Sequence, residues 1–234
     1  MHRLRAAQAP VRPDLVDVSL ERSGSTASFR VVPRDPELGD VLAAMGFDCS
    51  DDGFVRSFPD SADVQRIFEN FATHVDEMLR HKTGEARAPW EGALELVVDR
   101  LTGEVDWWLS GSAALAVRDI AVEPRDVDLV VDGAERVGEL LREFAVEPVK
   151  PMAGWVADRH GRAFSGALIE WVSGVHPDVD RPGRSEQGPE AARRREEVVW
   201  RRRPILCSPL DLQLAVSAAR GLDDRVAAIR NVLA

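Results

Sequence analysis

The most constraining feature of the sequence is the stretch 107–132, which reads WWLSGSAALAVRDIAVEPRDVDLVVD. Residues 105–109 form a largely apolar run with the length and composition of a strand. Small residues at 110–112 break this run, and the alanine-rich segment 113–118 favours a helix. Residues 126–131 read DVDLVV, and the alternation of a strand places Asp126 and Asp128 on one face. The stretch therefore predicts strand, turn, helix and strand, with two carboxylates projecting from the second strand.

Two carboxylates on one strand face repel each other, and burying either of them without a partner is costly. Asp126 and Asp128 therefore point to a cation, and hard oxygen ligands of this kind suit Mg²⁺ held together with substrate phosphates. The turn at Gly111-Ser112 offers backbone N–H groups at the start of a helix, where an anion such as phosphate is favoured. Together the two features predict a site for a nucleotide and Mg²⁺.

The order and spacing of these residues resemble the signature of the polymerase-β-like nucleotidyltransferase superfamily. The signature consists of Gly111-Ser112, thirteen further residues and then Asp126-Val127-Asp128 between apolar neighbours. The surrounding sequence is similar to the antibiotic-modifying and minimal-nucleotidyltransferase branches. The resemblance implies that Gly111 and Ser112 hold the triphosphate of ATP or another NTP, and that Asp126 and Asp128 bind two metal ions. The alternative is a strand–helix–strand unit whose two aspartates merely end a strand.

The resemblance also implies a third carboxylate on a strand beside the first two. Glu170, within the apolar run 167–172, is the candidate for that metal ligand or for the acceptor of the nucleophile's proton. Relatives often have aspartate here, and the alternative is a glutamate on an edge strand that faces water. Arg118 and Arg125 are candidates for a charge-assisted contact with the phosphates.

The chain is expected to be α+β, with a nucleotidyltransferase-fold mixed sheet flanked by helices. Residues 1–86 read as a small α+β domain of unknown role, in the order β-β-α-β-β-α after a loose arm at 1–12. The polar stretch 82–89 ends in proline and is the candidate boundary, so residues 87–234 form the nucleotidyltransferase-like domain. Strands are expected around 154–158 and 166–172, and residues 198–206 are expected to form one further strand. Two helices are expected to close the chain.

Composition narrows the functional classes. A net charge of −10 argues against a broad surface for nucleic acid, which is held mainly by Lys and Arg. No apolar run has the length of a membrane span, and Cys49 and Cys207 lack metal-ligand spacing. We therefore expect a cytoplasmic protein with two free thiols and no membrane segment. His176, Asp178 and Asp180 lie in a stretch rich in Pro and Gly, which favours a surface loop over a metal cluster.

The sequence thus predicts a Mg²⁺-dependent nucleotidyltransferase that moves NMP, first of all AMP, from an NTP to a hydroxyl group of a small molecule. A toxin-type enzyme acting on tRNA or protein is the alternative acceptor class. A non-catalytic module that binds nucleotide or a protein partner is the alternative from another functional class. The oligomeric state and the role of residues 1–86 are left open.

Overall fold

The computed structural model describes residues 13–152, 157–177 and 185–233. The expected arm at 1–12, most of the strand expected at 154–158, and Asp178 and Asp180 lie outside these residues.

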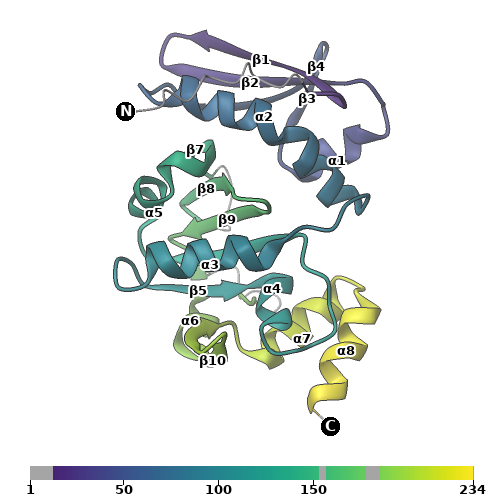
Figure 1. The fold of residues 1–234 in the computed structure, drawn as a ribbon, viewed down its shortest axis with the longest axis vertical. Helices are drawn as coiled ribbons and strands as arrows, with labels where there is room; N and C mark the ends of the chain where they lie inside the picture. Colours follow the sequence, from purple (N-terminus) through teal and green to yellow (C-terminus); the bar gives the residue numbers. More distant parts are fainter. Residues whose placement is uncertain (1–12, 153–156, 178–184, 234) are drawn as a thin grey trace, which may run out of the picture.

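The first third of the chain folds into a small antiparallel sheet backed by a long helix, as the sequence predicts (Figure 1). In the described part of the chain this small sheet has four strands in the order β1-β2-β4-β3. Phe29, Phe58 and Phe71 pack their rings between the sheet and the helix. The elements are β1 (Val16–Ser23), β2 (Thr26–Pro33), α1 (Leu38–Ala44), β3 (Asp48–Ser50), β4 (Gly53–Pro59) and α2 (Val64–Thr83).

The remainder forms a larger mixed sheet flanked by helices and closed by two C-terminal helices, so the chain is α+β as expected. The first part comprises α3 (Trp90–Leu101), β5 (Trp107–Ser110), α4 (Gly111–Ala116), β6 (Asp126–Val131), α5 (Ala134–Leu140), a 3₁₀ turn (Arg142–Phe144) and β7 (Ala145–Pro151). The second comprises β8 (Arg159–Phe164), β9 (Leu168–Ser173), α6 (Pro189–Arg193), β10 (Glu196–Trp200), β11 (Arg203–Cys207), α7 (Leu210–Ala219) and α8 (Asp223–Leu233).

The strands of this large sheet follow the order β10-β11-β5-β6-β9-β8-β7 within the described residues. Strand β6 runs parallel to β9 and antiparallel to β5, so it occupies a central position. Helices α3 and α5 pack on one face, where Val127, Leu129 and Val131 of β6 join the main core. The alternation of β6 therefore turns Asp126 and Asp128 to the other face.

The small sheet and the large sheet share a core. Helix α2 lies between them (Figure 1), and Ala145, Val146, Phe164 and Leu168 of the large sheet belong to the same buried cluster as the small sheet. The Asn70 side chain on α2 also donates to the Ala145 carbonyl at 3.0 Å. The boundary at residue 86 stays a prediction, and the packing shows that the two parts bury apolar surface against each other.

Three expectations about local structure differ from the fold. The strand expected at 198–206 is a hairpin, because Arg201 and Arg202 adopt positive φ angles of 48° and 67° and turn the chain between β10 and β11. Residues 157 and 158, the described part of the strand expected at 154–158, are not in a strand, and β8 begins at Arg159. Helix α2 continues to Thr83 and ends at Gly84 in the left-handed conformation, so Lys82 belongs to the helix rather than to a linker.

Cys49 is exposed, Cys207 is buried, and both are free, as expected. No helix in the described ranges is long and apolar enough to cross a membrane.

Candidate active site

The register of the large sheet aligns polar and charged residues in a row across five strands. Asp128 lies opposite Ser110 of β5 on one side and opposite Glu170 of β9 on the other. Glu170 lies opposite Arg162 of β8, which in turn lies opposite Glu147 of β7. Directly opposed residues share a face of a sheet. The register alone therefore brings the predicted carboxylates Asp128 and Glu170 together, with a guanidinium beside them.

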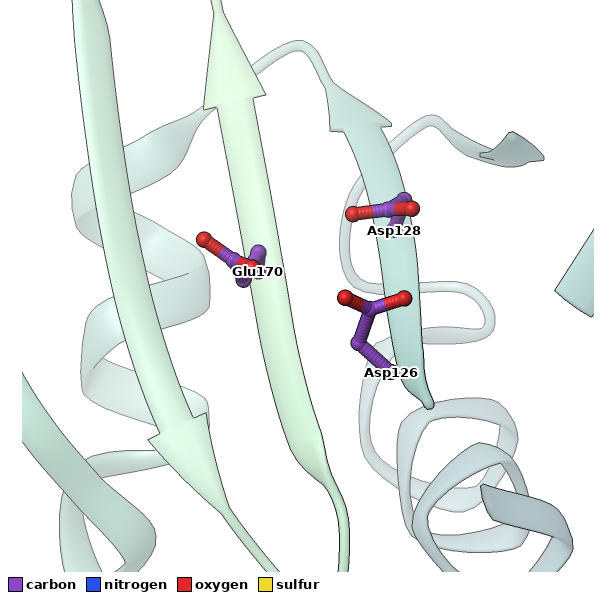
Figure 2. Close-up of side chains that lie close together, drawn as sticks. All are labelled: Asp126, Asp128 and Glu170. Atoms are coloured by element: carbon purple, nitrogen blue, oxygen red, sulfur yellow. The ribbon is translucent and has the colours of Figure 1, made fainter. Parts of the chain in front are cut away.

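Asp126 joins these two carboxylates to form the acidic trio, Asp126, Asp128 and Glu170 (Figure 2). One oxygen of each side chain lies within 4.8 Å of the others, and this is the single group of that kind among the described residues. The side chains of Asp126 and Glu170 are 16% and 15% exposed. Burial raises the pKa of Asp128, and the neighbouring Asp126 and Glu170 raise it further. Three partly buried carboxylates so close together require positive charge.

Part of that charge comes from Lys82, in the last turn of α2. Its Nζ lies 2.5 Å from Asp126 Oδ2 and 3.2 Å from Glu170 Oε2. Burial alone would lower the pKa of Lys82, but the carboxylates of Glu170 and Asp126 outweigh it and raise the pKa above its ordinary value. The lysine is therefore charged, and it joins the first third of the chain to the acidic trio.

Glu170 is held by cations at both of its oxygens. Arg162 donates from Nε to Glu170 Oε1 at 2.7 Å, and His160 Nε2 lies 3.4 Å from the same oxygen. Burial alone would raise the pKa of Glu170, but Arg162, the hydrogen bond with His160 and Lys82 hold it well below its usual range. Glu170 is therefore an ionised carboxylate, and a low pKa weakens it as a proton acceptor.

A buried ion network continues from Arg162 to the small sheet. Arg162 donates to Glu147 Oε1 at 2.8 Å, and Arg56 of β4 donates to Glu147 Oε2 at 2.8 Å. Glu147 is 2% exposed. Arg56 also donates to the carbonyls of Met45 and Gly46, and one of its amino groups lies 3.4 Å from His160 Nδ1. The small sheet thus supports the side chains that hold Glu170.

We expect Arg56→Met to lower the free energy of unfolding by about 3–5 kcal/mol at pH 7, because removing one partner leaves buried charge uncompensated. Burial alone would raise the pKa of Glu147, but Arg162 and Arg56 outweigh it and lower the pKa below its ordinary value of 4.5. This contribution to stability is complete above the ordinary pKa and is lost as the pH falls through the lowered value. The loss caused by Arg56→Met should therefore shrink in acid.

Urea unfolding at several pH values measures this effect. Arg203→Met is the matched control, because Arg203 pairs with Asp99 at the surface, where ion pairs add little to stability. Equal midpoints for the two variants at pH 7 would show that the buried network does not stabilise the fold.

Gly111 lies against Asp128, and a side chain would not fit there. Its φ of +64° is in the left-handed region, and a Cβ would lie 2.2 Å from Asp128 Oδ2. The Gly111 N–H donates to Glu186 Oε2 at 3.1 Å, and the Gly111 carbonyl accepts from Gln213 Nε2 at 2.8 Å. The predicted phosphate turn therefore adjoins the predicted metal pair, and its amide currently binds a carboxylate.

The acidic trio, Lys82 and the Gly111 turn line one cavity with a volume of about 630 Å³. Its lining brings together the acidic trio, the Gly-Ser turn, and cationic side chains from α2, from the loop before β6 and from the two C-terminal helices. The lining residues are Lys82, Gly111, Ser112, Glu123, Arg125, Asp126, Asp128, Glu170, Glu186, Gln187, Arg220, Leu222 and Arg225. A volume of this size is typical of sites for small ligands and cofactors.

The two predicted arginines differ in their positions. Arg125 lines the cavity and also donates to the Lys82 carbonyl at 2.8 Å, which attaches the end of α2 to the start of β6. Arg118 is not among the described residues that line the cavity. It donates to the Ser208 carbonyl and to Glu196, both at 2.8 Å, and so connects α4 to β10 and to the start of α7.

Several site residues were missed from the sequence. The sequence pattern places Lys82 in the candidate boundary stretch 82–89. Nothing in the spacing connects it to Asp126 and Glu170, which lie more than 40 positions away. Arg220 and Arg225 bracket the turn Gly221-Leu222-Asp223-Asp224, so two arginines around a turn that follows a helix were an available signal. Of His176, Asp178 and Asp180, which the sequence assigns to a surface loop, only His176 lies in the described part of the chain. Its Nε2 lies 2.7 Å from Asp158 Oδ1.

Comparisons with known proteins give weak likenesses. No family model and no curated protein matches the sequence. A crystal structure from Thermotoga maritima, provisionally assigned as a nucleotidyltransferase, is 20% identical and covers 60% of this chain and 90% of its own, with a TM-score of 0.47. Two structures of ANT(2'')-Ia also match: a solution structure titled as an antibiotic-resistance factor and a crystal structure with adenylyl-2''-tobramycin.

The solution structure is 13% identical, with a TM-score of 0.38, and covers 60% of this chain and 78% of its own. The crystal structure is 16% identical, with a TM-score of 0.37, and covers 62% of this chain and 87% of its own.

Proposed function

We propose that this chain is a Mg²⁺-dependent nucleotidyltransferase that moves a nucleoside monophosphate from an NTP, first of all ATP, to a hydroxyl group of a small molecule. The observation that carries the proposal is the joining of the acidic trio, the Gly111 turn and several cationic side chains in one cavity. A metal site, a close backbone approach and positive charge are what a triphosphate with its cation requires.

The donor set fits Mg²⁺. Carboxylate oxygens are its preferred protein ligands, and the close spacing within the acidic trio suits a shared cation. Asp128 has no hydrogen bond or ion pair among the described residues, so it is the carboxylate most in need of a cation. Asp126 and Asp128 would hold Mg²⁺, which supplies charge stabilisation to the phosphates. Glu170 would complete the negative set, as the sequence resemblance implies.

The cationic side chains of the cavity would hold the triphosphate. Arg125, Arg220 and Arg225 line it from two sides, and guanidinium groups bind phosphate through charge-assisted hydrogen bonds. Gly111 and Ser112 would contact the β- and γ-phosphates at the turn. Because Glu186 accepts the Gly111 N–H in this structure, a phosphate would take the place of that carboxylate.

The reaction then needs little covalent participation by the protein. The acceptor oxygen forms a bond to the α-phosphorus while the bond from that phosphorus to the bridging oxygen of pyrophosphate breaks. The pyrophosphate leaves with the electron pair, and the hydroxyl proton passes to water or to a carboxylate of the site. Holding the two reactants in line and balancing charge is the main contribution of such a site.

Surface charge favours a small acceptor over nucleic acid. The arginines of the segments 193–195 and 201–203 are largely paired with acids: Arg194 with Asp211, Arg195 with Asp106, and Arg203 with Asp99. Together with the net charge of −10, this pairing leaves little basic surface for a phosphate backbone.

ATP labelled at the α-phosphate, incubated with the protein, Mg²⁺ and a cell extract, tests the function and its acceptor class. We expect the label to move from ATP to a new small-molecule product, with release of unlabelled pyrophosphate. Label on tRNA or on protein alone would reject the small-molecule acceptor and favour the toxin-type alternative. No Mg²⁺-dependent binding of ATP, combined with tight binding of a protein partner, would favour a non-catalytic module.

A further inference from the structure

Lys82 occupies the position between two of the predicted metal ligands. Its Nζ contacts Asp126 Oδ2 at 2.5 Å and Glu170 Oε2 at 3.2 Å, and its side chain is 23% exposed. The helix that carries it is fixed at this end, because Arg125 donates to the Lys82 carbonyl and Gly84 caps the helix in the left-handed conformation. The ammonium is therefore positioned by the fold at the acidic trio.

Both carboxylate oxygens of Glu170 already contact basic side chains. Oε1 accepts from Arg162 and lies close to His160, while Oε2 contacts Lys82. Arg162 is in turn fixed by Glu147 and by the Met45 carbonyl. A metal ion at Glu170 would lie close to the Lys82 ammonium, and the two positive charges would repel each other.

Within the acidic trio, the charges balance except at Asp128. Arg162 neutralises Glu170, and Lys82 neutralises Asp126. Asp128 has no ion pair among the described residues, and its carboxylate lies beside the Gly111 turn. One carboxylate of the trio thus remains for an added cation.

The choice of lysine rather than arginine at position 82 also suits a group that lies in the place of a metal ion. Lys82 is one of only two lysines in a chain whose other basic residues, apart from five histidines, are all arginine. An ammonium is a compact, strongly hydrated point charge, whereas a guanidinium is a planar fork. Of the two basic groups, the ammonium is the closer substitute for a small metal ion between two carboxylates.

We infer that the Lys82 ammonium takes the place of one of the two divalent cations that the sequence resemblance implies. The nucleotide-loaded site then holds a single Mg²⁺, on Asp128 and on the oxygen of Asp126 that Lys82 does not contact. This inference rests on the proposed function, and it assigns to the first third of the chain a direct part in charge stabilisation at the site.

Metal stoichiometry tests the inference without any measurement of activity. Mn²⁺ replaces Mg²⁺ as a probe, and bound Mn²⁺ is counted by electron paramagnetic resonance on the full chain with a saturating non-hydrolysable ATP analogue. We expect one ion per chain in the wild type and two in Lys82→Met, which keeps the length of the side chain and removes its charge. Lys82→Arg keeps the charge and should bind one ion.

Lys150→Met is the matched control, because it removes the other lysine, which lies over Phe58 and does not line the cavity. It should bind one ion. Two ions in the wild type would overturn the inference and leave the proposed function intact, and this result does not depend on how any variant folds. One ion in a folded Lys82→Met would also overturn it. No ion in any of these proteins would overturn the proposed function itself.

Discussion

Replacement of Asp128 by asparagine is expected to abolish Mg²⁺-dependent nucleotide binding while the fold stays intact. Asparagine is almost isosteric with aspartate but carries no charge, and Asp128 is the one carboxylate of the trio without an internal cation. Loss of an outer-shell partner already costs about 10–100-fold in metal affinity, so loss of a ligand should cost more. Calorimetric titration of a non-hydrolysable ATP analogue, with and without Mg²⁺, measures the change.

The same substitution should make the metal-free protein more stable. It removes a partly buried carboxylate that lies beside two others, and for a chain of this size each kcal/mol of stability raises the melting temperature by about 2–4 °C. Added Mg²⁺ should raise the melting temperature of the wild type more than that of the variant. Asp132→Asn serves as the control, because Asp132 is exposed and directly follows the same strand, and this variant should bind nucleotide normally. Retention of tight Mg²⁺-dependent binding in Asp128→Asn would refute the assignment of the site.

Gly111→Ala is expected to prevent nucleotide binding, because the added methyl group would clash with its surroundings. The added methyl group would lie 2.2 Å from Asp128 Oδ2, so the Asp128 side chain or the turn has to move. The alanine would also have to adopt a φ of +64°, at a cost of about 1–2 kcal/mol. We therefore expect nucleotide binding to be lost and the free energy of unfolding to fall by more than the backbone cost alone. Calorimetry and urea unfolding measure the two effects.

Gly24→Ala separates the two causes. Gly24 has a similar φ of +59°, in the hairpin turn between β1 and β2, and a Cβ there would meet nothing within 4 Å. It should therefore show the backbone cost with normal nucleotide binding. Equal losses of stability in the two variants, with binding kept in both, would mean that the space beside Asp128 is not critical.

The sequence predicted those parts of the fold that local pattern determines. The apolar stripe of α2, the alternation of β6 and the order of elements in the first third all appear as expected, because periodicity follows directly from helix and strand geometry. The hairpin of β10 and β11 was missed. Its turn is made by Arg201 and Arg202, and arginine carries no composition signal for positive φ.

The site was predictable only where its residues lie near one another in sequence. Gly111, Asp126 and Asp128 belong to one strand–helix–strand unit, and the structure brings them together as the spacing indicated. Glu170 required the resemblance, since its position opposite Asp128 depends on the parallel pairing of β6 and β9. Lys82 and Arg56 could not be found, because their place at the site depends on how α2 and the small sheet pack against the large sheet.

The supply of Lys82 and Arg56 by the first third of the chain has a consequence for protein engineering. A fragment that begins at residue 87 would lack both cations. It would leave Glu147 with one guanidinium instead of two, and it would expose the apolar side chains of β7 and β8 that α2 covers. The first third therefore cannot be removed or replaced by another domain without loss of side chains that the site uses. Efforts to redirect acceptor specificity should keep the whole chain and treat α2 as part of the designable cavity wall.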